Sequence, residues 1–277
     1  MEFQNIERII EYINKHNKAN MTLVMSTPQT YINALKAENI TWPVKYDDMF
    51  PYAHTSNDYW TGYFSSRPAA KKQVKDASSL FSAEMKLFSE RVITENVKAS
   101  DVSDVLLAKQ SMLESLSIYQ HHDAITGTAK QYVADDYSFR MQRSIDFSSK
   151  TYFKELSERL ARATGIKAAN LSMCVGSNNF TVHQCPIDIK GNNEKLEFIV
   201  IAHNQADRVF DRFIKVKLPH KAYRAQVWNK TSLVFTDVVT DVMEQSHFSL
   251  ANEKEFEFEM YVPHRMEANE VSFIKVI

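Results

Sequence analysis

Residues 102–128, VSDVLLAKQSMLESLSIYQHHDAITGT, combine a helical pattern with a group of polar side chains at its end. Apolar residues recur at the spacing of one helix face, at Val102, Val105, Leu106, Leu113, Leu116 and Tyr119. Ser100 or Asp101 can cap the start of this helix, and Gly127 interrupts the pattern after it. The stretch therefore predicts an amphipathic helix that opens into a turn.

Two further helical runs flank this stretch. The run before it is marked by Leu80, Phe81, Met85, Phe88 and Val92, and the run after it by Val133, Tyr137, Met141, Ile145, Tyr152, Leu156 and Leu160. Three amphipathic helices with short connections predict an antiparallel three-helix bundle, to which we assign residues 67–165.

Residues 1–66 have a different pattern. Four isoleucines between residues 6 and 13 recur at helical spacing, residues 22–26 (TLVMS) predict a short strand, and Thr27-Pro28 opens a second helix through Leu35. One β/α unit cannot close a sheet by itself, so we expect these residues to belong to a larger domain. Residues 43–68 form a long aromatic loop, which is typical of a functional segment.

After Gly165 the apolar period changes to two, which predicts strands. We expect strands at residues 196–202, 213–218, 223–228, 232–236, 255–262 and 271–277. One buried face and one polar face are typical of an antiparallel β-sandwich, which we assign to residues 166–277 and expect to be incomplete. The predicted fold class is thus α+β with several domains.

Composition excludes several classes of protein. The 277 residues suit about two domains, and 33 Lys and Arg against 34 Asp and Glu leave a formal net charge of −1. That charge gives no bulk attraction to nucleic acid or to an anionic membrane. The five glycines are too far apart for a phosphate-binding loop. No apolar run approaches the roughly 20 residues of a membrane-spanning helix. We expect neither a nucleic-acid partner nor a membrane span.

Cysteines and glycosylation acceptors favour the secretory pathway. Cys174 and Cys185 enclose a short turn-rich stretch that is compatible with a disulfide, and two free thiols are the alternative. Five Asn-x-Ser/Thr acceptors are present, against roughly two or three expected by chance. They are Asn20, Asn39, Asn170, Asn179 and Asn229.

His121, His122 and Asp123 are the strongest candidates for chemistry, because they can ligate a metal, relay protons or bind hydroxyl groups at a helix end. Neighbours on a regular helix diverge by about 100°, so at most one histidine should be a metal ligand. The alternative is an exposed helix end whose histidines complement the helix dipole. The other seven of the nine histidines are scattered singly.

Two strings resemble the signatures of the glycoside hydrolase family 38 α-mannosidases. One is QHHDAITGT at residues 120–128, continued by Gln131 and by VADDY at 133–137, and the other is FPYAHTSNDYWTGYFSSRP at residues 50–68. The VADDY continuation and the region of the two cysteines look most like the lysosomal-type branch, which implies a lysosome or another secretory compartment.

The resemblance implies a fold and a site. Members combine an α/β barrel-like catalytic domain, a three-helix bundle and β domains, so residues 1–66 would end the catalytic domain. They bind one zinc ion through two His and two Asp, and His122 matches one ligand. Asp123 matches a residue that binds mannose hydroxyls, His121 lies near the substrate, and Trp60 lines the sugar pocket. We expect His122 to reach into a pocket bordered by Trp60.

The remaining zinc ligands, the nucleophile and the acid/base lie, by this resemblance, in an upstream catalytic-domain segment. We therefore assign no catalytic residue here, and take the Asp47-Asp48 and Asp135-Asp136 pairs and Asp58 as loop and helix-start charges. The expected function is that of part of a retaining, zinc-dependent α-mannosidase that acts on mannose-containing N-glycan oligosaccharides, inactive as this chain alone.

Two alternatives belong to other classes. A non-catalytic carbohydrate-binding or scaffold protein would keep the bundle and the sheet without the chemistry. A helical partner-binding module predicts a large exposed apolar stripe on the bundle.

Overall fold

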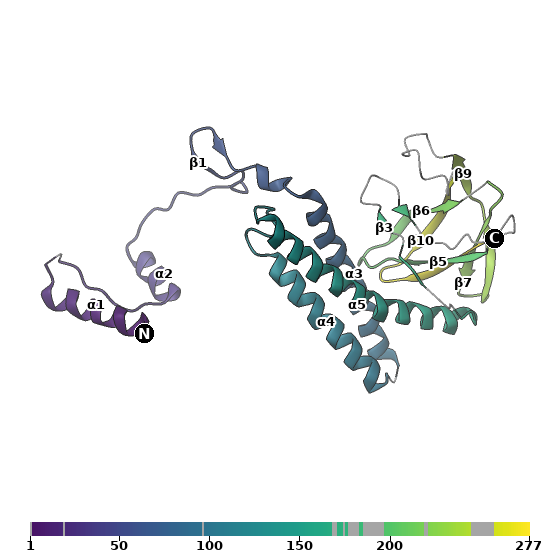
Figure 1. Ribbon diagram of the computed structural model, residues 1–277, viewed down its shortest axis with the longest axis horizontal. Helices are drawn as coiled ribbons and strands as arrows, with labels where there is room; N and C mark the ends of the chain where they lie inside the picture. The colour runs from purple at the N-terminus through teal and green to yellow at the C-terminus, as the bar shows by residue number, and fades with distance from the viewer. Residues whose placement is uncertain are drawn as a thin grey trace. The chain divides into compact units, whose positions relative to one another are not determined.

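The computed structural model describes residues 2–18, 20–95, 97–167, 171–173, 175–176, 183–184, 197–218, 221–244 and 258–277 (Figure 1). Two predicted glycosylation acceptors, Asn170 and Asn179, and the two cysteines of the possible disulfide, Cys174 and Cys185, lie outside these ranges. The chain divides into two compact units, Met1–Trp60 and Thr61–Ile277. The domain limits expected at residues 66/67 and 165/166 stay predictions.

The first unit contains the two helices expected near the N-terminus. Helix α1 spans Glu2–His16, and α2 spans Pro28–Ala37. Thr27 caps α2, because its hydroxyl accepts a hydrogen bond from the backbone N–H of Thr30 at 3.2 Å, and Pro28 occupies the first turn. Both helix predictions are confirmed.

The strand expected at residues 22–26 was wrong, since this segment is irregular and exposed. Its backbone is bonded locally: Asn14 Nδ2 donates to the carbonyl of Leu23, and the N–H of Leu23 donates to Asn14 Oδ1, both at 2.8 Å. These groups are thus satisfied without a neighbouring strand. The aromatic segment instead forms an antiparallel hairpin of β1 (Ala53–Thr55) and β2 (Asp58–Tyr59).

Three long helices follow the short 3₁₀ helix η1 (Gly62–Phe64) in the second unit. They are α3 (Pro68–Thr94), α4 (Ala99–Tyr119) and α5 (Gln131–Thr164), and they confirm the three helical runs. The three helices lie side by side (Figure 1). They share an apolar core that includes Leu87, Met112, Met141 and Leu160.

The predicted cap of α4 was wrong. The helix begins at Ala99, with Lys98 at the N-cap position and no side-chain cap bond, so Asp101 lies inside the first turn. Asp101 accepts a bond from Lys154 Nζ at 2.7 Å and faces Arg91 at 3.4 Å. Its carboxylate is engaged by α5 and α3, which leaves it unavailable to the start of its own helix.

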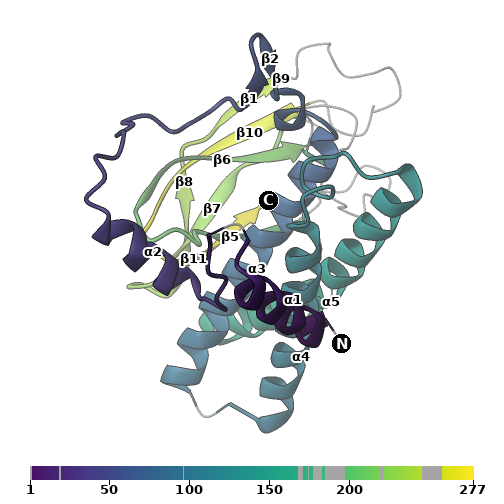
Figure 2. The same ribbon diagram turned by 90° about the vertical axis from the view of Figure 1, so that its left-hand side faces the viewer.

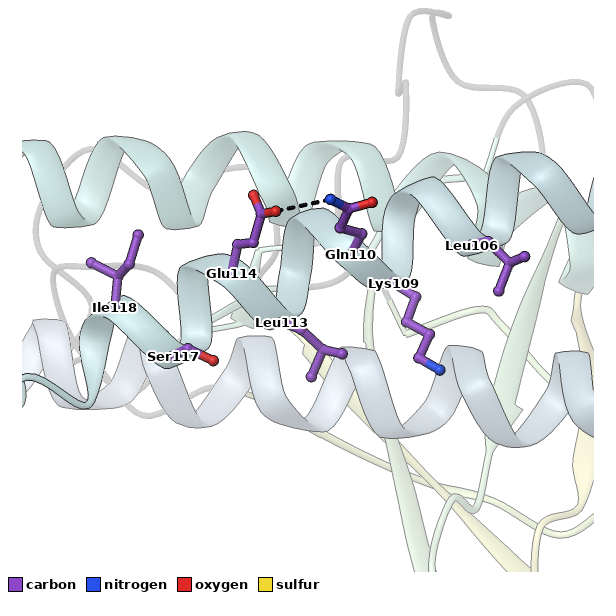
Figure 3. Close-up of a pocket in the computed structure, with 7 residues that line it drawn as sticks. All are labelled: Leu106, Lys109, Gln110, Leu113, Glu114, Ser117 and Ile118. Atoms are coloured by element: carbon purple, nitrogen blue, oxygen red, sulfur yellow. Dashed lines mark hydrogen bonds between the residues drawn. The ribbon is translucent and has the colours of Figure 1, made fainter.

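The buried face of α4 also differs from the prediction in part. Val105, Ala108 and Met112 are buried, whereas Leu106 and Leu113 are 53% and 40% exposed. The two leucines line a groove along the outer face of α4, together with Lys109, Gln110, Glu114, Ser117 and Ile118 (Figure 3). Within the second unit, α4 packs against α3 and α5 on its opposite side. Helix α4 therefore has buried apolar residues on one face and exposed leucines on the other.

The strands form antiparallel sheets. The strands are β3 (Val175–Gly176), β4 (His183–Gln184), β5 (Phe198–His203), β6 (Phe210–Leu218), β7 (Ala225–Asn229), β8 (Val234–Val238), β9 (Asp241–Glu244), β10 (Phe258–Met266) and β11 (Val271–Val276). One sheet has the order β5-β11-β7-β8, and a second has β6-β10-β9 (Figure 2). β5, β6, β7, β8, β10 and β11 confirm predicted strands, whereas β3, β4 and β9 were not predicted. The α+β class is confirmed.

Strand β11 joins two cores. Val271 and Phe273 pack into the helical core, whereas Ile274 and Val276 belong to a second core with Val216 and other apolar residues of β6, β7 and β10. Side chains alternate between the faces of a strand, so the four-stranded sheet contacts the helices on one face and the other sheet on its opposite face. None of the helices within the described ranges combines the length and apolar character needed to cross a bilayer.

One buried carboxyl interrupts the helical core. Glu84 of α3 is only 2% exposed, and its Oε1 accepts a hydrogen bond from the hydroxyl of Thr151. Its Oε2 has no hydrogen-bond partner among the described residues. Burial raises the pKa of Glu84 above its ordinary value, and the hydroxyls of Thr151 and Ser148 oppose this shift. Folding therefore shifts this carboxyl toward its protonated form relative to the unfolded chain.

We predict that Glu84→Gln stabilises the chain in a pH-dependent way. At pH 7 the substitution removes a buried charge with an unsatisfied oxygen, so the free energy of unfolding should rise by about 1–3 kcal/mol. Below the ordinary pKa of 4.5 the carboxyl is protonated in both states, so the difference should vanish near pH 4. Urea unfolding at both pH values measures this.

Glu114→Gln is the matched control, because Glu114 lies on the exposed face of α4 and accepts its bond from Gln110 there. It should change stability little at either pH. Equal stabilisation by Glu84→Gln at pH 4 and pH 7 would contradict the assignment of a buried, raised-pKa carboxyl.

Candidate functional site

The candidate site lies on the turn that follows α4. The helix ends at Tyr119, and Gln120 is its C-cap residue. Backbone hydrogen bonds then close successive turns, from the N–H of Ala124 to the carbonyl of His121 at 2.9 Å and from that of Gly127 to the carbonyl of Ala124 at 3.1 Å. The site residues therefore lie beyond the regular helix.

His121, His122 and Asp123 come together on this turn. The two Nε2 atoms lie 3.4 and 3.5 Å from Asp123 Oδ2, and the imidazole ring centroids are 4.3 Å apart. The expectation that adjacent histidines diverge was wrong, because it assumed a regular helix where the chain forms a turn. One ligand atom from each residue lies within 4.8 Å of the others. Two imidazoles and a carboxylate are ligand types that zinc accepts, so this donor set fits the metal.

Threonine side chains fix the carboxylate. Thr128 donates its hydroxyl to Asp123 Oδ1 at 2.6 Å, and the N–H groups of Thr128 and Ala129 donate to the Asp123 carbonyl at 3.1 and 3.0 Å. The bond from Thr128 lowers the pKa of Asp123, and the charges of His122 and His121 add to the effect. Thr126 donates its hydroxyl to the carbonyl of His122. Asp123 is therefore held as a carboxylate.

Within the described part of the second unit, the three site side chains are open to solvent, and the pocket expected around His122 stays a prediction. The side chain of His122 is 85% exposed, and those of His121 and Asp123 are 44% and 45% exposed. Two pockets of this unit lie elsewhere, along α4 and among the charged residues between α3, α4 and α5. The residues of this unit thus form an open surface, because the turn projects past the end of α4.

A glycine allows this turn to approach the start of α3. Gly127 has φ +78°, and a Cβ atom built on it would lie 2.8–2.9 Å from two oxygens of Ser66. An L-residue is unfavourable in this backbone conformation, and the contact leaves no room for its side chain. Glycine is therefore required for both reasons.

Trp60 belongs to the first unit, where the hairpin orients its ring. Its Nε1–H donates to His54 Nδ1 at 2.9 Å, and His54 Nε2 lies 3.1 Å from Asp58 Oδ2. Tyr52 packs edge-on against the indole, at 5.5 Å between ring centroids. Trp60 remains 53% exposed. The single N–H of the indole is already bonded, so the remaining exposed surface of the ring is apolar.

The five other aspartates considered in the sequence analysis have partners close by in the chain. Asp47 and Asp48 accept bonds from the N–H groups of Met49 and Phe50. Asp135 accepts from Gln131, and Asp136 pairs with Arg140. Asp58 pairs with His54. These contacts agree with the interpretation of all five as loop and helix charges.

Comparison with known proteins identifies the family. Residues 58–160 match the family model described as the α-mannosidase middle domain. The chain is 33% identical over 242 residues to a lysosomal α-mannosidase of Felis catus, covering 86% of this chain and 22% of that protein. The chain belongs to the α-mannosidases of glycoside hydrolase family 38.

The chain is also similar to α-mannosidases from other organisms. An α-mannosidase of Arabidopsis thaliana is 40% identical over 155 residues, which cover 56% of this chain and 14% of that protein. The crystal structure of an α-mannosidase from Enterococcus faecalis V583 aligns with 99% of this chain and 30% of its own, with a TM-score of 0.51 and 12% identity. That likeness shows the fold alone. The chain spans about a fifth or less of these two curated relatives.

Sequence reasoning missed the supporting groups of the site. Thr126 and Thr128 flank Gly127 in the quoted string, so their hydroxyls were a visible signal for a polar turn. The pairing of His54 with Trp60 and Asp58 had only the i, i+4 spacing of His54 and Asp58 as a signal.

We predict a graded cost for alanine at three glycines. Gly62→Ala should change stability by less than about 0.5 kcal/mol, because nothing lies within 4 Å of the added Cβ. Gly165→Ala should cost about 1 kcal/mol, since its φ is +75° but the space is open. Gly127→Ala should cost about 2–4 kcal/mol, because the clash with Ser66 adds to the backbone cost.

Urea unfolding of the three variants measures these costs, and Gly165→Ala is the control for backbone conformation alone. A cost for Gly127→Ala no larger than that for Gly165→Ala would contradict the close approach to Ser66.

Proposed function

We propose that this chain supplies one zinc ligand and the mannose-binding residues of a retaining α-mannosidase. One observation carries the proposal: the segment that matches the family model contains a turn on which two imidazoles and a carboxylate converge. The substrate would be α-linked mannose of N-glycan-type oligosaccharides. The end of a barrel-like catalytic domain would be formed by the first 66 residues, followed by the helical middle domain and the start of a β domain.

His122 would hold the zinc ion through an imidazole nitrogen, with the other ligands on an upstream catalytic-domain segment. When bound, zinc supplies Lewis-acid stabilisation and orients the sugar. A side chain that binds a metal together with another segment must be accessible from outside its own unit. The side chain of His122 is 85% exposed, which meets this requirement. His121 would lie beside the substrate.

Asp123 and Trp60 would bind the sugar. An ionised carboxylate accepts strong hydrogen bonds from hydroxyl groups, and the Thr128 bond leaves Asp123 Oδ2 as the outward acceptor. The apolar C–H face of a hexose packs on an aromatic ring, which suits the exposed indole of Trp60. The nucleophile and the acid/base would both be aspartates of the upstream segment, so this chain would bind and orient substrate without performing proton transfer.

The proposed compartment is the secretory pathway, most specifically the lysosome. Curated relatives from Felis catus and Dictyostelium discoideum are lysosomal α-mannosidases. Three of the five glycosylation acceptors, Asn20, Asn39 and Asn229, are described and all are exposed, as a glycan requires.

The alternative is a non-catalytic carbohydrate-binding or scaffold protein with the same architecture. It predicts a coding sequence without an upstream in-frame His-x-Asp motif and paired aspartates. Sequencing of the transcript upstream of Met1 separates this alternative from the enzyme.

We predict that zinc binding and hydrolysis require both this chain and the upstream segment. The 277-residue chain alone should bind zinc weakly and cleave p-nitrophenyl α-mannoside at no more than background, because a tight zinc site needs about four ligands. In the longer polypeptide, His122→Ala should lower zinc content and activity by at least about tenfold. Metal analysis and the chromogenic assay measure both.

His16→Ala is the matched control, because His16 is an exposed histidine at the end of α1 that stacks on Tyr12. It should leave zinc content and activity unchanged. Strong turnover by the 277-residue chain alone, or full zinc content in His122→Ala, would refute the proposal.

A further inference from the structure

We propose that Arg67 and Lys71, at the start of α3, are positioning residues that hold the turn of His121, His122 and Asp123 in its site geometry. This inference rests on the proposed function, because it assumes that the turn carries the site. Neither side chain touches the three site residues in any described hydrogen bond, so both would act through the backbone of residues 125–129.

Arg67 contacts the far side of the turn through all three guanidinium nitrogens. Nε donates to the carbonyl of Gly127 at 3.3 Å, and the two terminal nitrogens donate to the carbonyl of Ala129 at 3.2 Å and to Gln131 Oε1 at 2.9 Å. A planar guanidinium can address several acceptors at fixed angles, which a lysine ammonium cannot do. Arg67 thus joins two segments about 60 residues apart in the chain.

Lys71 adds a second anchor one helical turn later. Its Nζ donates to the carbonyl of Ile125 at 2.8 Å and to that of Ser66 at 2.6 Å. Ser66 donates its own hydroxyl to the carbonyl of Gly127 at 3.1 Å. Together these side chains bind the alternate carbonyls of residues 125, 127 and 129, which we call the carbonyl clamp.

The clamp and the site meet in residues 125–129. Thr128 lies between the clamped carbonyls of Gly127 and Ala129, and its hydroxyl and N–H bond to Asp123. Thr126 lies between the clamped carbonyls of Ile125 and Gly127, and its hydroxyl bonds to the carbonyl of His122. Fixing the carbonyls therefore fixes the threonines that orient the site.

The backbone of Arg67 is itself unfavourable for a residue with a side chain. Its φ is +50°, in the left-handed region, and it caps α3 without a side-chain cap bond. The side chain instead makes the three bonds to residues 127–131. An unfavourable conformation persists only where surrounding contacts favour it, and the clamp supplies those contacts.

The core that joins the helices is formed by residues outside the clamp. The helices already share the core formed by Leu87, Met112, Met141 and other buried residues. A purely structural role would therefore appear as a change of global stability, whereas a positioning role would appear as local opening of the turn.

Hydrogen exchange of the 277-residue chain tests the clamp without requiring mannosidase activity. In Arg67→Asn and Lys71→Met, exchange of the Thr128 and Ala129 amides should speed up by at least about tenfold, while the Met141 and Leu156 amides in α5 stay within about twofold. Asn is chosen because it tolerates the left-handed backbone, and Met because it keeps the lysine stem.

Two controls make the result specific. Arg140→Ala breaks only an exposed pair with Asp136 on α5 and should leave the turn amides unchanged. Arg67→Lys should behave like Arg67→Asn, because it keeps the charge and loses the fork. Unchanged Thr128 and Ala129 exchange in both clamp variants, or an equal increase in α5, would overturn the proposal.

A second measurement links the clamp to the site. Zn²⁺ titration followed by the imidazole NMR signals of His121 and His122 should require at least about tenfold more Zn²⁺ in Arg67→Asn than in the unmodified chain. Equal midpoints would overturn the positioning role. If Zn²⁺ moves neither imidazole even in the unmodified chain, the proposed metal role fails, while the exchange result still decides the clamp.

Discussion

The contact between the start of α3 and the turn after α4 is the constraint on which the candidate site depends. The side chains of Ser66, Arg67 and Lys71 reach carbonyls of the turn that lie more than 50 residues away in the chain. The approach is possible only because Gly127 has no Cβ. The end of one string that resembles a family 38 signature, Ser66 and Arg67, therefore meets the other string in space. We infer that their joint occurrence reflects one structural unit.

The rest of the second unit provides a rigid base for this contact. Arg91 of α3 faces Asp101 of α4 at 3.4 Å and Glu155 of α5 at 2.9 Å, so charged groups as well as apolar residues join the three helices. Strand β11 then connects the helical core to the core between the sheets. A turn held at the end of such a base can present side chains outward without support from its own surroundings.

Apolar periodicity predicted most of the helices and strands. It failed where contacts with other parts of the chain determine the local structure or the burial of a side chain. The helices and six strands followed from apolar spacing, because burial of one face dominates their formation. Residues 22–26 have strand-like composition, but Asn14 bonds the backbone N–H and carbonyl of Leu23 at the middle of this segment. Leu106 and Leu113 match the helical period, yet a helix with partners on one side leaves them exposed. The convergence of His121 and His122 was missed because the end of α4 could be located only approximately from sequence.

The central claim is that His122 is a ligand of a metal shared with an upstream segment. The most direct measurement is anomalous diffraction at the zinc edge from crystals of the longer polypeptide. The account predicts an ion about 2.0–2.1 Å from an imidazole nitrogen of His122, with its remaining ligands outside this chain. An ion bound elsewhere, with the His122 ring still open to solvent, would contradict it.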